Sequence, residues 1–167
     1  MEQMFALIPG QIQDKHAIQK VIKCNEYTYQ YGLTLSETQA KELIQTRNLA
    51  LKSNGRVEFG GGIIDKLIKE FCDSPFITKY NYAETIDELI EIFYYYKNET
   101  LECIGDDELL SLMKEYFDNN CKGALELLQN RELDKLAHNI RFGVADYANV
   151  KDEKPVELFD EEEKNDE

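Results

Sequence analysis

Apolar residues recur every three or four positions along most of the sequence, with polar and charged residues between them. This spacing is typical of an amphipathic α-helix, because residues three or four apart share one helical face. The predicted helices cover about residues 14–31, 37–54, 64–71, 82–98 and 106–117, followed by two short helices on either side of a break near Asn130. The stripe over 82–98 is the most regular, so we expect this helix to be central.

Two of these helices begin with the spacing of a capping box. In this motif the first side chain accepts a hydrogen bond from a backbone N–H, and a side chain three residues later reaches back. Ser36 with Gln39 and Asn81 with Glu84 have this spacing. Asp106 is the predicted N-cap of a later helix, whose first turn holds further acidic residues that the helix dipole favours.

The fold class follows from these helices. Residues 56–59 alternate polar and apolar side chains, which allows one short β-strand or hairpin near 56–59. We therefore predict an all-α fold, a compact bundle of six or seven amphipathic helices. The segments SETQAKELI and AETIDELI look alike, but their alignment needs a shift of one residue. We interpret the likeness as common to capped amphipathic helices and find no internal repeat.

The net charge of −14 is unevenly distributed. Residues 151–167 hold nine acidic residues and three lysines, and a segment of this kind buries too little apolar surface to offset its ordering entropy. We predict a single helical domain over residues 1–150 and an acidic, disordered tail over 151–167. Because so acidic a chain repels phosphate backbones, we expect no nucleic-acid partner.

Targeting signals and cysteine usage indicate a cytoplasmic protein. No window approaches the roughly 20 apolar residues of a membrane span, so no membrane partner is expected, and the N-terminus lacks the pattern of a secretory signal. The cysteines have no metal-ligand spacing, so we expect four free thiols: Cys24, Cys72, Cys103 and Cys121. We predict no cofactor and no metal, and the oligomeric state stays unassigned.

No group of residues forms a recognisable catalytic constellation. Acidic side chains are plentiful, but nothing in the sequence singles out a pair for acid and base work. His16 and His138 both fall on the outward sides of their predicted helices. We therefore assign no catalytic residue and favour a binding protein over an enzyme.

Gly60, Gly61 and Gly62 precede a predicted helix, an arrangement that can present backbone N–H groups to a phosphate. A phosphate-binding loop would continue with Gly-Lys-Ser/Thr, whereas residues 63–65 are Ile-Ile-Asp. Asp65 also stands where a dinucleotide-binding fingerprint needs its third glycine. We interpret the run as a hinge or a close crossing of two backbones, with an anion site as the alternative.

Arg47 interrupts the apolar stripe of its predicted helix, with a leucine one turn away on either side. A guanidinium is almost never buried unpaired. Asn25 takes the matching place in the first helix, so we expect the two side chains to share a hydrogen bond or a carboxylate such as Glu58. Three interpretations stay open: a polar network that fixes helix register, a ligand-binding arginine in a groove, and a side chain whose head reaches solvent.

Tyr95 is the most unusual of the ten tyrosines. It projects away from the apolar stripe of its helix, onto the face that carries Glu84, Glu88 and Glu91. An exposed tyrosine among carboxylates suits contact with a basic partner. Packing by a neighbouring helix is the alternative.

Four collinear blocks resemble a known family: GRVEFGGG from Gly55, FCDSPF from Phe71, FYYYKNET from Phe93 and DDELL from Asp106. Together they are similar to a small family of uncharacterised proteins from Gram-positive, Firmicutes-type bacteria, classified as a domain of unknown function. The resemblance covers about residues 20–135. It implies a bacterial, cytoplasmic protein and brings no activity, ligand or catalytic residue.

Two functional hypotheses follow. The first is a non-enzymatic binding or regulatory module that engages a protein partner through an acidic, tyrosine-bearing surface that includes Tyr95. The alternative is a sensor or enzyme for an anionic metabolite, with a site around Arg47, Arg56, Glu58 and Gly60–Gly62.

Overall fold

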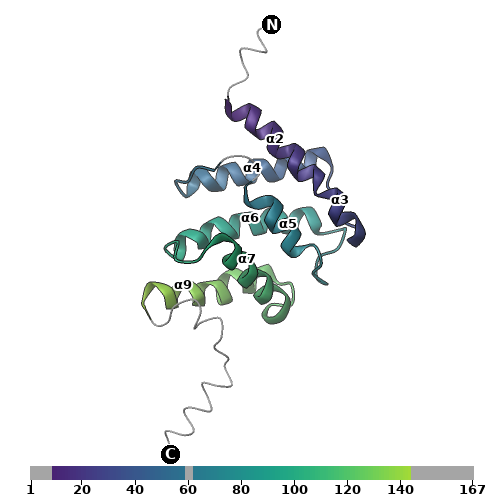
Figure 1. The fold of residues 1–167 in the computed structure, drawn as a ribbon. Coiled ribbons are helices and arrows are strands. Elements are labelled where there is room, and N and C mark those ends of the chain that lie inside the picture. The colour runs from purple at the N-terminus through teal and green to yellow at the C-terminus, as the bar shows by residue number, and fades with distance from the viewer. Residues whose placement is uncertain (1–8, 59–61, 144–167) are drawn as a thin grey trace, which may run out of the picture.

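The computed structural model describes residues 9–58 and 62–143, and these are mostly helical (Figure 1). The all-α fold is therefore confirmed, and the described residues contain no strand. The elements in chain order are α2 (Pro9–Lys23), α3 (Asn25–Thr28), the 3-10 helix η1 (Tyr29–Tyr31), α4 (Glu37–Ser53), α5 (Ile63–Phe71), α6 (Tyr82–Glu99), α7 (Asp106–Glu115), the π-helix η2 (Tyr116–Asn120), α8 (Leu125–Leu127), the π-helix η3 (Leu128–Leu133) and α9 (Asp134–Arg141).

The helices form three pairs stacked in two layers (Figure 1). The helix α2 packs on α4, α5 packs on α6, and α7 with η2 packs on the segment that ends in α9. One layer holds α4, α6 and α9, and the other holds α2, α5 and α7. The helix α6 is central, as predicted, because it contacts α4, α5, α7 and α9.

The two largest neighbours, α4 and α6, run parallel to each other. Near the start of α6, the Thr46 hydroxyl donates a hydrogen bond to the Asp87 carboxylate at 2.5 Å. Near its end, the Asn98 amide donates to the Asn54 side-chain oxygen at 3.1 Å. Later residues of α4 thus pair with later residues of α6, which means that the two helices run in the same direction. Their C-terminal ends lie at the same edge of the domain (Figure 1).

The predicted apolar stripes make the core. Phe71, Phe93 and Phe117, from α5, α6 and η2, are each at most 1% exposed. The rings of Phe71 and Phe117 meet edge to face with centroids 5.5 Å apart, which joins the second helix pair to the third. Burial of a side chain of this size stabilises the fold by roughly 1.5–3 kcal/mol.

One of the two predicted capping boxes is present. The Ser36 hydroxyl accepts from the Gln39 backbone N–H at 3.1 Å, and the Gln39 side chain accepts from the Ser36 N–H at 2.9 Å. The box predicted at Asn81 is wrong, because its side-chain oxygen accepts instead from the backbone N–H of Thr78 at 2.8 Å. That bond closes the turn before α6 and leaves no acceptor for the first turn of the helix.

Asp106 is also not the N-cap that the sequence predicted. The cap position of α7 is Gly105, and Asp106 is the first helical residue. Its carboxylate is engaged by Lys97, 2.8 Å away, which explains why it does not fold back onto its own helix.

The predicted break near Asn130 is wrong. Helical residues continue from Leu125 to Arg141, with the π-helix η3 in place of a break. A π turn holds more residues than an α turn, so apolar positions on one side of it fall out of phase with those on the other. The apolar residues of the sequence contain this shift in phase, and we interpreted it as a break between two helices.

The strand predicted near 56–59 is also wrong where the structure describes it, because Arg56, Val57 and Glu58 are not in a strand. Val57 is 80% exposed, so the alternation reflects polar contacts of its neighbours and not a sheet with a buried face. Phe59, Gly60, Gly61 and the predicted tail over 151–167 lie outside the described residues. Within the described ranges, none of the helices has both the length and the apolar character needed to span a bilayer.

Candidate functional site

The structure brings three of the predicted site residues, Arg47, Glu58 and Gly62, together around Tyr94. The Tyr94 hydroxyl donates a hydrogen bond to the Glu58 carboxylate at 2.5 Å. Gly62 has a positive φ of 58°, and a Cβ atom there would stand 2.1 Å from the same carboxylate oxygen. Gly62 therefore lies against the end of the Glu58 side chain and not against a second backbone. The hinge or close backbone crossing expected of Gly60, Gly61 and Gly62 stays a prediction, because Gly60 and Gly61 lie outside the described residues.

Burial raises the pKa of Tyr94, and the hydrogen bond to Glu58 and the charge of Glu58 raise it further. The positive charge of Arg47 opposes these effects. Tyr94 therefore stays protonated and donates, while Glu58 accepts. Arg47 is 3% exposed, and its guanidinium also donates to the Asn48 side-chain oxygen at 2.8 Å.

Asn25 does not meet Arg47, so that predicted contact is wrong. The Asn25 amide donates to the Leu35 carbonyl at 2.9 Å, and its oxygen accepts from the Leu35 N–H at 2.8 Å. These two bonds fix the connection that enters α4. A side chain that can bond the backbone of its own connecting loop has no need of a partner on the facing helix.

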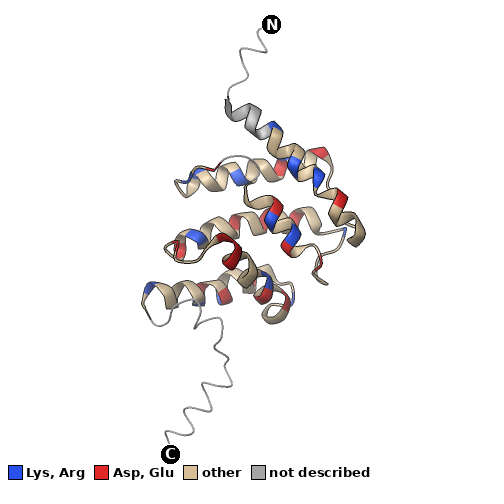
Figure 2. Ribbon diagram, in the orientation of Figure 1, with Lys and Arg blue, Asp and Glu red and all other residues tan. Residues whose placement is uncertain are grey.

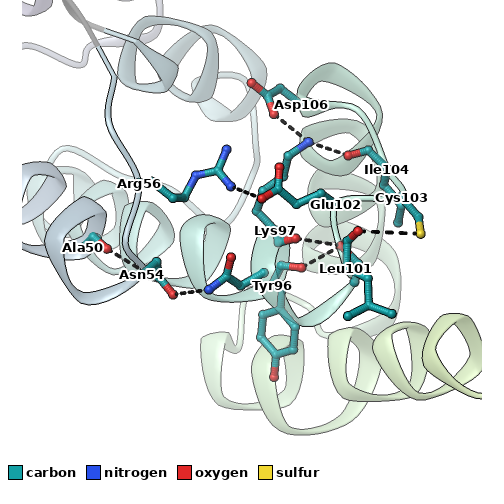
Figure 3. Close-up of polar contacts among 12 residues, drawn as sticks. Ala50, Asn54, Arg56, Tyr96, Lys97, Leu101, Glu102, Cys103, Ile104 and Asp106 are labelled. Atoms are coloured by element: carbon teal, nitrogen blue, oxygen red, sulfur yellow. Dashed lines mark hydrogen bonds and ion pairs between the residues drawn. The ribbon is translucent and has the colours of Figure 1, made fainter.

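Arg56 points toward the end of α6 (Figure 3). Its guanidinium forms an ion pair with Glu102 at 2.7 Å, and its Nε is buried without an acceptor among the described residues. Beside it, Lys97 is 6% exposed and donates to the Ile104 carbonyl and to the Asp106 carboxylate (Figure 3).

Lys97 and Glu102 were not among the site residues that the sequence predicted. The sequence held a signal for Lys97 only. Lys97 stands one turn after Phe93 on the apolar face of α6, as conspicuous there as Arg47 is in α4. Glu102 had no such signal, because it lies in the turn that follows the helix.

That turn holds two consecutive residues, Leu101 and Glu102, at φ 56°. The left-handed region costs a non-glycine residue about 1–2 kcal/mol. Hydrogen bonds hold the turn in place, among them the Thr100 hydroxyl to the Tyr96 carbonyl at 2.8 Å and the Glu102 N–H to the Lys97 carbonyl at 3.1 Å. The strained turn places the Glu102 carboxylate against Arg56.

These residues form a group that we name the charged cluster: Arg47, Arg56, Glu58, Tyr94, Lys97, Glu102 and Asp106. Arg56 is paired with Glu102 and Lys97 with Asp106. Within the described residues, the cluster therefore contains carboxylates beside its cations, the arrangement that buried charges require. The charged cluster links α6 to residues 56–58, which precede it in the chain, and to residues 102–106, which follow it.

A second feature lies near the start of α6, in the groove between the parallel helices α4 and α6. It encloses about 210 Å³ and is lined by Gln39, Glu42, Leu43, Ala83, Glu84 and Asp87. We name it the acidic groove, because its lining includes three carboxylates and no basic residue.

The outward face of α6 continues the acidic groove. Glu84, Glu88 and Glu91 are exposed and form no ion pair among the described residues. Tyr95 is 50% exposed, and its ring meets Tyr96 edge to face with centroids 4.8 Å apart. Half of the Tyr95 side chain thus faces solvent, and we name Glu84, Glu88, Glu91 and Tyr95 the α6 row.

His16 and His138 are exposed, on the outward sides of their helices. Cys24, Cys72 and Cys121 are buried, as expected of small apolar side chains, and Cys103 is exposed. Among the residues that the structure describes, no three His, Cys, Asp or Glu side chains are grouped so that they could hold a metal ion.

The fold and these features define a class: an all-helical domain of stacked helix pairs, with an internal charged cluster and an open acidic face. Residues 20–146 match the model of a family of unknown function, DUF6323, and the chain belongs to this family. No curated protein and no solved structure matches the chain.

Proposed function

We propose that the chain is a non-enzymatic binding module that engages a basic segment of a protein partner through the acidic groove and the α6 row. The observation that carries the proposal is that the described residues lining the groove include three carboxylates and no basic side chain. Carboxylates that have no cation of their own attract one from elsewhere, which raises the rate of encounter with a basic partner.

The length of this surface suits a peptide segment. Glu84 and Tyr95 are eleven residues apart on one helix, which corresponds to about 16 Å at 1.5 Å per residue. Measured along the helix axis, successive members of the α6 row are separated by roughly 4.5–6 Å. In an extended peptide, alternate residues are about 6.6 Å apart on one face, so every second side chain can meet one carboxylate.

Tyr95 adds an aromatic contact at the end of the row. An arginine placed over a tyrosine ring gains about 0.5–1 kcal/mol at an exposed site. Arginine is therefore favoured over lysine opposite Tyr95. We place this interaction in the bacterial cytoplasm, and the net charge of −14 supports a protein partner over a nucleic acid.

The test is a titration with a fluorescently labelled twelve-residue peptide of alternating arginine and alanine, followed by anisotropy at low salt. The variant Glu88→Gln, Glu91→Gln is expected to bind about five- to tenfold more weakly than wild type. Tyr95→Ala is expected to weaken binding as well, while Tyr95→Phe keeps the ring and should bind like wild type.

The matched control is Glu115→Gln, Glu126→Gln, which changes the net charge equally at two exposed residues of α7 and α8. It is expected to bind within about twofold of wild type, because exposed charges are screened beyond a Debye length of about 10 Å. If both double variants lose the same affinity, the peptide senses only the total charge and the proposal is refuted.

The site for an anionic metabolite around Arg47, Arg56, Glu58 and Gly60–Gly62 stays a prediction. The contacts described there are with groups of the chain itself, so a ligand would have to displace Glu102 to reach Arg56. The acidic groove needs no such rearrangement, and this difference favours the first proposal.

A further inference from the structure

The lysines of α2 and α5 gather around a second hollow, in contrast to the acidic groove. This hollow encloses about 340 Å³ and is lined by Lys20, Lys23, Cys24, Glu26, Tyr27, Asp65 and Lys69. Figure 2 shows basic segments of α2 and α5 on the same side of the domain. We name this feature the basic hollow.

Two of its three lysines have no carboxylate partner in the described part of the chain. Lys20 lies 3.6 Å from Asp65, but Lys23 and Lys69 form no ion pair there, and both are exposed. Glu26 and Asp65 also line the hollow, so three ammonium groups face two carboxylates and one positive charge is left over. An anion placed between Lys23 and Lys69 relieves the repulsion between these two ammonium groups. In the charged cluster, by contrast, Arg56 and Lys97 already have carboxylates.

The walls of the basic hollow add an aromatic surface and no further charge. Asp65 is paired with Lys20 through its Oδ2 atom, and its Oδ1 atom is buried and does not face solvent. Tyr27 is 43% exposed and its ring lies edge-on to Tyr31, which gives one flat wall. Burial raises the pKa of Cys24 to about 11, so its thiol stays neutral and adds no negative charge.

We propose that the basic hollow binds a small anion with two or more neighbouring negative groups, such as a phosphorylated or polycarboxylated metabolite. Lys23 and Lys69 pair with the negative groups, while Lys20 stays paired with Asp65. The volume lies at the lower end of the range for small-molecule pockets, about 300–1,000 Å³, which favours a metabolite over a macromolecule. This site is independent of the acidic groove.

The test is isothermal titration of the full chain with inorganic pyrophosphate and, separately, with citrate at low ionic strength. Submillimolar binding of at least one anion is expected. Binding of pyrophosphate alone identifies a phosphate site, and binding of citrate alone identifies a polycarboxylate site. If neither anion binds with a Kd below about 1 mM, the proposal is overturned.

The variant Lys23→Gln, Lys69→Gln is expected to bind at least about tenfold more weakly. The matched control is Lys52→Gln, Lys135→Gln, two exposed lysines outside the hollow, which should bind within about twofold of wild type. An equal loss in both double variants overturns the proposal. All four lysines are exposed, so both double variants are expected to fold normally and to keep the circular dichroism spectrum of wild type. Binding of the arginine–alanine peptide tests the acidic groove separately, so failure of one proposal is distinguishable from failure of the other.

Discussion

Replacement of Gly62 by alanine tests the close approach at the start of α5. The new Cβ atom would stand 2.1 Å from the Glu58 carboxylate oxygen, so this carboxylate has to move away. The same oxygen accepts the hydrogen bond of the Tyr94 hydroxyl. Gly62→Ala is therefore expected to break that bond as well as to strain the backbone.

The expected cost has two parts. A non-glycine residue with positive φ costs about 1–2 kcal/mol. Tyr94 is fully buried, and a buried hydroxyl that loses its acceptor costs about 1–3 kcal/mol. Together these predict a loss of about 2–5 kcal/mol in the free energy of unfolding, a large part of the about 5–15 kcal/mol that holds a typical domain folded.

Urea unfolding followed by far-ultraviolet circular dichroism measures this loss. Gly55→Ala is the matched control, because Gly55 also has a positive φ, 65°, but a Cβ atom there meets nothing within 4 Å. Gly55→Ala therefore measures only the cost of placing a non-glycine residue at a positive φ, about 1–2 kcal/mol in the free energy of unfolding. Both substitutions stiffen the unfolded chain alike. Gly62 has a ψ of −129°, outside the left-handed helical region, so its own backbone cost adds to the difference and the contact with Glu58 is isolated by the double-mutant cycle.

A double-mutant cycle sharpens the result. Tyr94→Phe removes the hydroxyl, so Gly62→Ala made in that background has no hydrogen bond left to break and should cost about 1–3 kcal/mol less than in wild type. If Gly62→Ala costs no more than Gly55→Ala, or if the cycle is additive, the described contact is not present in solution.

Two further predictions concern the third helix pair. Ser74→Ala should cost about 1–2 kcal/mol, because the buried Ser74 hydroxyl donates to Asp118 at 2.6 Å; a urea midpoint equal to that of wild type would contradict this. Burial raises the pKa of Tyr116 to about 12, above the roughly 10 of an unfolded tyrosine, so the unfolded state loses its proton first and stability should fall as the pH rises from about 10 to 12. Between pH 9 and 11, Tyr116→Phe should lose less stability than wild type in urea titrations, and equal losses would refute the assignment.

The sequence predicted the helices well, because a buried face leaves a periodic record in the chain. It also identified Arg47 and Gly62 correctly as special, since a charge in an apolar stripe and a glycine before a helix both break a local rule. It could not predict their partner Tyr94, because the offset between two packed helices depends on side-chain fit and has no local signature. The same limit explains the wrong pairing of Asn25.

The likeness of SETQAKELI and AETIDELI did not predict the packing of their helices. SETQAKELI spans the cap and first half of α4, and AETIDELI lies in the first half of α6. The two starts differ, because Ser36 forms a capping box and Asn81 does not. Neither segment alone contains the information that their helices are parallel neighbours.

The stacked arrangement has a consequence for how the chain acquires its structure. Each helix pair touches mainly the pair before or after it, so few contacts join the first pair to the third. Helical domains of this kind are expected to fold rapidly. Such a chain can nucleate at more than one pair and grow outward from there. Damage to the terminal pair at α9 should then leave the pair of α5 and α6 formed, whereas damage to α6 removes the template on which both neighbours assemble.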